Sequence, residues 1–236
     1  MGIDALVFDF DGLILDTEWS EFSTVRAEFE AHGVELTLDE WRHGVGRADN
    51  RHWSAWLAEV AERPVDVDVV RARRAEAHHA MVRREVVRPG VVALLDEAEA
   101  AGVPTAVATS SSTSWVVPHL ERLGLRHRFA SVRTADDVAR AKPAPDLYLA
   151  AAEALGADPS RSVALEDSHH GSTAARAAGF TCVVVPNEVT RLPAFPDADL
   201  VVDSLADIHL AGLVDLVART ARTRGSNESS RVGGRP

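Results

Sequence analysis

Short apolar runs alternate with helical patterns over most of the chain. Residues 3–10 form a nearly continuous apolar run, broken only by Asp4 and Asp9, which is typical of a strand buried on both faces of a sheet. Stretches with helical periodicity lie between this run and later ones. The later runs are found at residues 105–108, 162–165, 181–185 and 200–202. This alternation predicts an α/β fold with a doubly wound parallel sheet.

Residues 17–86 interrupt the alternation, because they carry helical periodicity without a convincing strand. We therefore expect an all-helical domain at 17–86, inserted into a core made of residues 1–16 and 87–218. Residues 219–236 are rich in Arg, Thr and Ser, with no apolar anchor before Val232, and they are predicted to form a disordered tail. Three tryptophans are expected in the apolar core of the helical domain: Trp41, Trp53 and Trp56.

Composition narrows the possible partners. The chain has 236 residues, a net charge of −11 and one cysteine, so a disulfide scaffold is excluded. A chain this acidic, without a basic cluster, repels nucleic-acid phosphates and anionic lipids, and we expect neither as a partner. No signal peptide is readable, and no apolar stretch is long enough to span a membrane. The expectation is a cytoplasmic monomer that binds a small solute.

Lysine is almost absent from the chain. Of the 25 basic residues, only Lys142 is a lysine and the others are arginine. An ammonium group is a compact charge, whereas a guanidinium group is broad and planar, so a narrow pocket accepts the first and rejects the second. Lys142 is therefore a candidate for a site that requires lysine; the alternative is that one lysine survived by chance.

Polar side chains follow three of the predicted strands, at the sheet edge where ligands of parallel α/β folds bind. Asp9 and Asp11 end the first strand and point to the same side of it. Hydroxyl side chains at 109–112 follow the second strand, and Glu166 and Asp167 follow the third. Carboxylates gathered in this way repel one another unless a cation is present, and hard oxygen ligands suit Mg²⁺. Helices that begin beyond these residues would direct free N–H groups at an anion.

These residues also form four ordered motifs. The motifs are residues 9–18 (Asp9-Phe10-Asp11-Gly12-Leu13-Ile14-Leu15-Asp16-Thr17-Glu18), Thr109, Lys142-Pro143 and Glu166-Asp167-Ser168. In this order and spacing they resemble the haloacid dehalogenase (HAD) superfamily, and most closely its β-phosphoglucomutase-like phosphatases. The resemblance covers roughly residues 3–202. It implies a Rossmann-like core with a helical cap domain inserted after the first motif.

The resemblance implies roles for the acidic residues. Asp9 would be the nucleophile that attacks phosphorus and forms an aspartyl-phosphate. Asp11 would protonate the leaving alcohol and then deprotonate the water that hydrolyses the intermediate. Mg²⁺ would be held by Asp9, the Asp11 carbonyl and Asp167, with Glu166 assisting, and it would offset the repulsion between carboxylate and phosphate.

The resemblance also implies contacts to the substrate. Thr109 and the backbone N–H of Ser110 would hold the non-bridging phosphate oxygens, and Lys142 would supply a positive charge. Arg47 lies in a glycine-containing loop of the cap that would face the distal end of the substrate. A solvated surface position for Arg47 is the alternative reading.

Departures from the family pattern favour one reaction over others. The dehalogenases lack an aspartate two residues after the nucleophile, whereas this chain has Asp11 and resembles phosphatases or mutases. In the related sugar phosphomutases a cap histidine and a cap lysine help to return the phosphorylated intermediate. Here Glu21 occupies the histidine position and the cap contains no lysine. We therefore expect hydrolysis of a small phosphorylated metabolite, with a sugar phosphomutase as the alternative and a receiver-like signalling domain as a more remote one.

Overall fold

The computed structural model describes residues 2–44, 52–192 and 194–232, with side chains described at 2–42, 52–192 and 194–224. Six parallel strands form one sheet in the order β3-β2-β1-β4-β5-β6. Chain order reverses between β1 and β4, which confirms the predicted doubly wound α/β class. The strands are β1 (Leu6–Phe8), β2 (Thr105–Ala108), β3 (Ser131–Arg133), β4 (Val163–Glu166), β5 (Thr181–Val184) and β6 (Leu200–Val201).

Strand β3 is the element that the apolar pattern does not predict. It pairs with β2 at the edge of the sheet, with Ala106 opposite Ser131, and it is only partly buried. An edge strand of three residues has no need for a continuous apolar run, because one side of it faces solvent. The central strands β1, β2, β4 and β5 are buried over their whole length, as their apolar runs predict.

Helices cover both faces of the sheet. On one face, α5, α6 and α9 pack against strand residues such as Leu6 and Phe8. On the other face, α7 and α8 pack against alternate strand residues such as Val7 and Ala164. These helices are α5 (Val91–Ala100), α6 (Thr113–Arg122), α7 (Asp146–Leu155), α8 (His169–Ala177) and α9 (Leu210–Val232).

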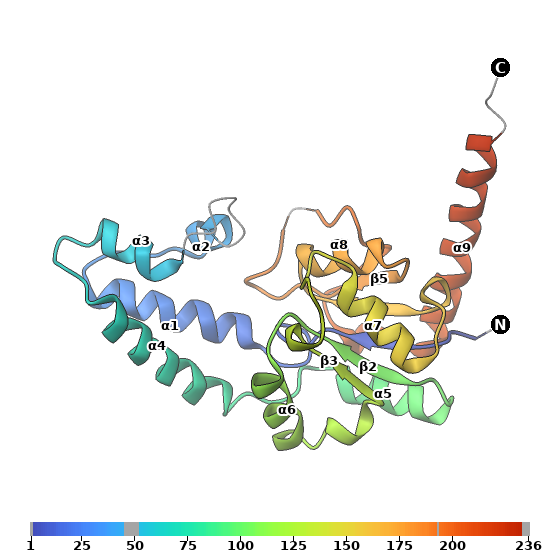
Figure 1. The fold of residues 1–236 in the computed structure, drawn as a ribbon, viewed down its shortest axis with the longest axis horizontal. Coiled ribbons are helices and arrows are strands. Elements are labelled where there is room, and N and C mark those ends of the chain that lie inside the picture. Colours follow the sequence, from blue (N-terminus) through green and yellow to red (C-terminus); the bar gives the residue numbers. More distant parts are fainter. Residues whose placement is uncertain (1, 45–51, 193, 233–236) are drawn as a thin grey trace.

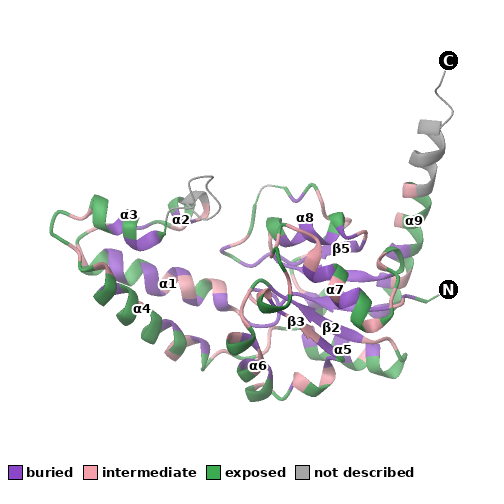
Figure 2. Ribbon diagram, in the orientation of Figure 1, coloured by how far each residue is buried: buried purple, intermediate pink, exposed green. Residues whose placement is uncertain are grey.

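A separate helical unit, α1–α4, extends from one end of the sheet (Figure 1). Its helices are α1 (Thr17–Ala31), α2 (Leu38–Gly44), α3 (Trp53–Val60) and α4 (Val67–Val82). The unit has its own apolar cluster, in which Trp41 and Trp53 are buried and Trp56 is partly buried, as predicted. Figure 2 shows that burial is concentrated in the strands, whereas α4 is exposed over most of its length.

Helix α9 differs from the predicted disordered tail at 219–236, because it continues to Val232. The physical reason is a polar anchor rather than an apolar one. The Arg224 guanidinium donates hydrogen bonds of 2.7 and 2.8 Å to the carbonyls of Gly179 and Phe180, and it lies 3.4 Å from an Asp199 oxygen. These contacts tie the helix to the segments that precede β5 and β6.

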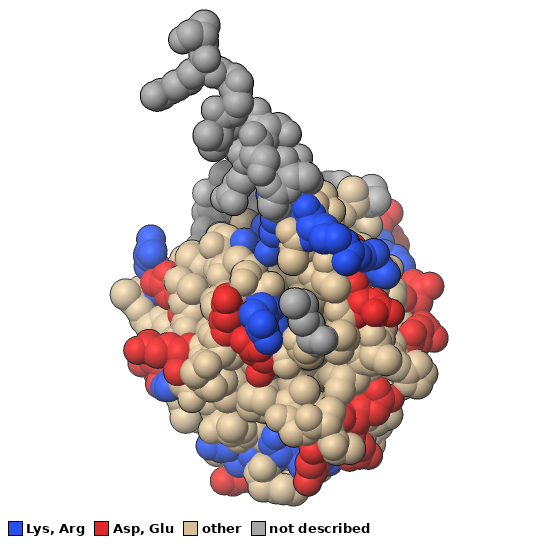
Figure 3. Space-filling view, turned by 90° about the vertical axis from the view of Figure 1, so that its right-hand side faces the viewer, with Lys and Arg blue, Asp and Glu red and all other residues tan. Residues whose placement is uncertain are grey.

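Within the described residues, we find no helix with the length and apolar character that crossing a membrane requires. On the face shown in Figure 3, acidic and basic side chains are interspersed and form no broad patch of one sign.

Candidate active site

A cavity of about 570 Å³ lies between the carboxyl ends of the strands and the helical unit. Its lining includes side chains that follow β1, β2 and β4, together with side chains from α1 and α4. We call these two sides the sheet-edge wall (Asp9, Lys142, Glu166 and Asp167) and the helical wall (Glu18, Glu21, His78 and His79). Glu166 lies directly behind the lining, and the other seven residues line the cavity.

The turn after β1 places the first two aspartates. The Asp9 N–H donates to the Leu165 carbonyl at 2.9 Å, which extends the pairing with β4 by one residue. Gly12 then turns the chain with a φ of +76°, and a Cβ at this position would lie 2.1 Å from an Asp167 oxygen. Glycine is therefore required here both for its left-handed backbone and for the close approach of Asp167.

Lys142 is the centre of the sheet-edge wall. Its Nζ lies 2.6 Å from Asp9 Oδ1 and 2.6 Å from Glu166 Oε1, and its side chain is only 6% exposed. The Tyr148 ring lies 5.1 Å from Nζ, and the Tyr148 hydroxyl donates to Glu166 Oε1 at 2.5 Å. Although burial by itself lowers the pKa of the ammonium, Asp9 and Glu166 raise that pKa above its usual value. Lys142 is therefore a fixed, permanent positive charge.

The carboxylates beside Lys142 are suited to a shared cation. Oxygen atoms of Asp9, Glu166 and Asp167 lie within 4.8 Å of one another. Burial raises the pKa of Asp9 to about 7, and it raises the pKa of Asp167 well above its usual value. One ammonium group does not balance three buried carboxylates, so a divalent cation would favour their ionised forms.

The free oxygens of this cluster show which carboxylates fit a metal ion. Asp9 Oδ2 and Asp167 Oδ1 accept no hydrogen bond within the described part of the chain. Asp167 Oδ2 accepts a bond of 2.7 Å from the Asn187 amide, which fixes that carboxylate. Both oxygens of Glu166 accept hydrogen bonds, from Lys142 and Tyr148 on one side and from residues 167 and 168 on the other. Asp9 and Asp167 therefore fit as direct ligands, and Glu166 holds Lys142.

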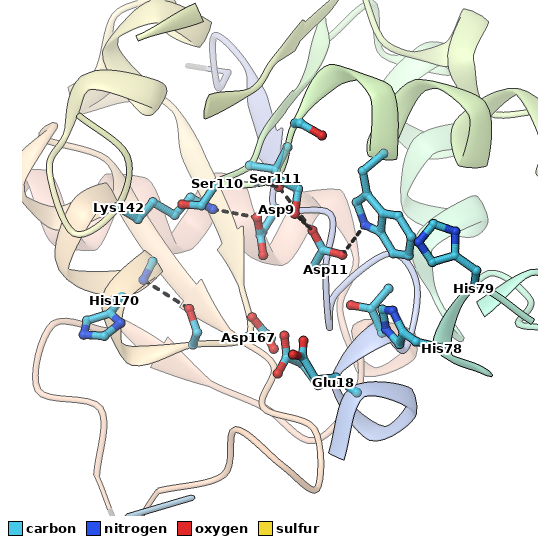
Figure 4. Close-up of a pocket in the computed structure, with 17 residues that line it drawn as sticks. Asp9, Asp11, Glu18, His78, His79, Ser110, Ser111, Lys142, Asp167 and His170 are labelled. Atoms are coloured by element: carbon cyan, nitrogen blue, oxygen red, sulfur yellow. Dashed lines mark hydrogen bonds and ion pairs between the residues drawn. The ribbon is translucent and has the colours of Figure 1, made fainter. Parts of the chain in front are cut away.

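The Asp11 side chain points away from this cluster. Its Oδ1 accepts a bond of 2.9 Å from the Trp115 indole N–H, and its Oδ2 accepts one of 2.6 Å from the Ser111 hydroxyl. Figure 4 shows Asp11 on the side of Asp9 that is nearer to His78 and His79, whereas Lys142 approaches Asp9 from the opposite side. The carboxylate of Asp11 is thus separated from the metal-type cluster and faces another part of the cavity.

The hydroxyl loop after β2 completes the sheet side of the cavity. Thr109 is buried and Ser110 lines the cavity, and the Ser111 N–H donates to Thr109 Oγ1 at 3.1 Å. Helix α6 begins just beyond this loop, with Ser112 at its N-cap position, and α8 begins after Ser168. Two helix N-termini next to an ammonium group form a favourable environment for an anion.

The helical wall is less tightly partnered. The pKa of Glu18 is raised to about 8 by burial and by neighbouring carboxylates, of which Glu21 contributes most. Glu21 forms an ion pair of 2.8 Å with Arg74, and its side chain is 40% exposed. Within the described part of the chain, Lys142 is the only lysine or arginine that lines the cavity.

The structure brings most of the predicted site residues together. Asp9, Asp11, Thr109, Ser110, Lys142 and Asp167 line one cavity, and Glu166 lies behind Lys142. Arg47 lies outside the described residues. Sequence reasoning did not identify Trp115, His78 or His79 as cavity residues. The available signal for Trp115 was its position in the first turn of the helix that follows the hydroxyl loop.

A family model described as haloacid dehalogenase-like hydrolase matches residues 3–179. YhcW of Bacillus subtilis, whose name describes a phosphatase, is 42% identical over 213 residues, which cover 90% of this chain and 97% of that protein.

Solved structures have the same fold. A crystal structure of a CbbY variant from Rhodobacter sphaeroides in complex with xylulose-(1,5)-bisphosphate is 32% identical, with a TM-score of 0.70 over 89% of this chain and 99% of that one. A Thermotoga maritima structure described as a β-phosphoglucomutase is 27% identical, with a TM-score of 0.75 over 90% of this chain and 99% of that one.

Proposed function

This chain belongs to the haloacid dehalogenase-like hydrolases and is a phosphatase, and from that premise we propose that it hydrolyses a small phosphorylated metabolite with Mg²⁺ through an aspartyl-phosphate on Asp9. The observation that carries the proposal is the arrangement of Asp9 between Lys142 and Asp167, with the Asp11 carboxylate turned away from all three. Such an arrangement separates a nucleophile from a proton donor, as phosphoester cleavage requires.

Asp9 is the nucleophile of this proposal. Lys142 holds its Oδ1, and its Oδ2 is free of hydrogen bonds within the described part of the chain. The free oxygen attacks phosphorus, the bond from phosphorus to the ester oxygen breaks, and the alcohol leaves. Because Lys142 stays charged, it reduces the repulsion between the carboxylate and the phosphate dianion.

Asp11 is the general acid and base. It is placed to exchange a proton with the leaving oxygen, because it lies apart from the metal-type cluster and the bonds from Ser111 and Trp115 fix its orientation. After the alcohol has left, the same carboxylate takes a proton from the water that attacks the aspartyl-phosphate. Thr109, the Ser110 N–H and Lys142 hold the non-bridging oxygens of the phosphoryl group.

Mg²⁺ fits the donor set that the chain offers. Asp167 would hold it through its free carboxylate oxygen, Asp9 through the oxygen that does not attack phosphorus, and Asp11 through its carbonyl, with Glu166 close behind. When bound, the ion supplies positive charge that offsets the charge on the phosphate oxygens. Asn187 keeps Asp167 in place for this role by donating to its other oxygen.

Hydrolysis is favoured over phosphomutase activity by the residues of the helical wall. Glu21 occupies the position of the mutase histidine, and a carboxylate there, paired with Arg74, repels a phosphate instead of holding it. The sugar bisphosphate bound by the CbbY relative supports a phosphorylated sugar or a similar small metabolite as substrate. Contact between Arg47 and the distal end of that substrate stays a prediction.

A panel of phosphorylated metabolites, tested with purified protein and Mg²⁺, examines the proposal. We expect release of inorganic phosphate from at least one small phosphomonoester, loss of activity with EDTA, and recovery when Mg²⁺ is restored. Hexose 1-phosphates belong in the panel, because conversion mainly to hexose 6-phosphate without release of phosphate would establish the mutase instead.

A further inference from the structure

We propose that Trp115 is a positioning residue, which holds the Asp11 carboxyl group in the direction needed for proton transfer to the leaving group. The inference rests on the acid–base role of Asp11 in the proposed function. It adds a residue of α6 that none of the four motifs contains.

Donors from three side chains fix the Asp11 carboxylate. The Trp115 indole N–H binds Oδ1 at 2.9 Å, while the Ser111 hydroxyl binds Oδ2 at 2.6 Å and Thr109 lies 3.4 Å from the same oxygen. Hydrogen bonds to both oxygens define the plane of a carboxylate as well as its position. Without the indole N–H, the remaining donors hold one oxygen only, and the carboxylate is free to turn about it.

The indole ring is itself held on several sides. His78 of α4 stacks on it with a centroid distance of 5.3 Å and an interplanar angle of 11°. His79 and His119 contact it in T-shaped geometry at 5.3 and 4.6 Å. His119 belongs to α6, whereas His78 and His79 belong to the helical unit. The ring is therefore clamped between the two parts of the molecule, and its N–H direction is set by both.

The direction of the acid matters most for poor leaving groups. A general acid accelerates bond cleavage when the departing oxygen is strongly basic, whereas p-nitrophenolate leaves readily without a proton. A loss of Asp11 orientation therefore predicts a rate loss that grows with the basicity of the leaving group. A general loss of packing, in contrast, predicts the same fold-decrease in rate for every substrate.

The test compares two aryl phosphates of similar size, phenyl phosphate and p-nitrophenyl phosphate. In Trp115→Phe, we expect kcat/KM for phenyl phosphate to fall about tenfold more than kcat/KM for p-nitrophenyl phosphate. The ratio of the two values, measured on one preparation, does not depend on the fraction of protein that is folded. A ratio equal to that of the wild type would overturn the proposal.

Trp41→Phe is the matched control, because the buried Trp41 indole N–H has no hydrogen-bond partner among the described residues and Trp41 does not line the cavity. It should leave the ratio at the wild-type value, and a change as large as that of Trp115→Phe would contradict the inference.

Asp11→Asn separates this inference from the function on which it rests. A larger change of the ratio than in Trp115→Phe supports both, whereas an unchanged ratio in Asp11→Asn removes the acid–base role itself.

Discussion

The sheet-edge wall and the helical wall of the cavity differ in how their charges are partnered. In the sheet-edge wall, Lys142 binds two carboxylates at 2.6 Å each, and its side chain is 6% exposed. In the helical wall, Glu21 is 40% exposed and forms one ion pair, with Arg74. Strand ends fix the carboxylates of the first set, and these carboxylates hold Lys142, whereas single helix positions present the second set.

This difference separates chemistry from recognition. Groups that take part in bond cleavage must be held at fixed distances, and the paired strand ends β1 and β4 provide that rigidity. Groups that contact the variable part of a substrate need no such network. We therefore expect substitutions in the sheet-edge wall to lower turnover of every substrate, and substitutions in the helical wall to alter substrate preference.

The largest effect is expected for Asp9→Asn. The amide is not a nucleophile, so turnover of p-nitrophenyl phosphate should fall at least about 1,000-fold. Lys142 keeps Glu166 as a partner, and the fold should therefore persist, as circular dichroism would show. The matched change in the helical wall, Glu21→Gln, should alter turnover of this small substrate less than about threefold. Near wild-type activity of Asp9→Asn would remove Asp9 from its role.

Lys142→Arg is expected to have the next largest effect. Asp9, Glu166 and the Tyr148 ring surround Nζ, and this space does not accommodate a planar guanidinium group. We expect kcat for p-nitrophenyl phosphate to fall about 100-fold. Arg140→Lys is the control, because Arg140 is 70% exposed and pairs with Asp146 at the surface. If Lys142→Arg were as active as Arg140→Lys, the rarity of lysine in the chain would be a coincidence.

Gly12→Ala and Gly33→Ala separate backbone strain from crowding of the site. Gly12 and Gly33 both have a positive φ, of +76° and +74°. A Cβ at Gly12 would lie 2.1 Å from an Asp167 oxygen, whereas a Cβ at Gly33 would have no atom within 4 Å. Each change should cost about 1 kcal/mol of stability for the left-handed backbone. Only Gly12→Ala should also raise the Mg²⁺ concentration needed for half-maximal activity, because it displaces Asp167. Equal Mg²⁺ titrations for the two variants would argue against a metal site at Asp167.

The last effect concerns the junction between the two regions, and it acts on stability rather than on turnover. Burial, together with the nearby Arg74 charge, lowers the pKa of His78 to about 4. Because unfolding releases this histidine to a pKa of about 6.5, the unfolded state binds more protons between those values. The contribution of His78 to the free energy of unfolding should therefore decrease as the pH falls from 6.5 to 4, by an order of 1–3 kcal/mol.

Denaturant unfolding at a series of pH values measures this decrease. His78→Phe, which keeps an aromatic ring on Trp115, should reduce the slope below pH 6.5. His127→Phe, at an exposed position, should keep it. Identical slopes for His78→Phe and wild type would show that His78 does not titrate as described.

The sheet-edge wall was largely predictable from the sequence and the helical wall was not. The apolar runs located five of the six strands, and parallel strands necessarily bring their carboxyl ends to one edge. The contact between Trp115 and Asp11 joins residues that are 104 positions apart, and the hydrophobic periodicity of the sequence carries no information about such a contact. Polar anchoring was missed for the same reason, since Arg224 extends α9 through carbonyls that lie more than 40 residues earlier in the chain.

Trapping the phosphorylated enzyme tests the central claim most directly. In Asp11→Asn, p-nitrophenyl phosphate should still phosphorylate the protein, because its leaving group needs no acid, whereas hydrolysis of the intermediate should be slow. After reaction with Mg²⁺, acid quenching and proteolysis, mass spectrometry should find one phosphoryl group, on the peptide that contains Asp9. A phosphoryl group on another residue, or none during turnover, would contradict nucleophilic catalysis by Asp9.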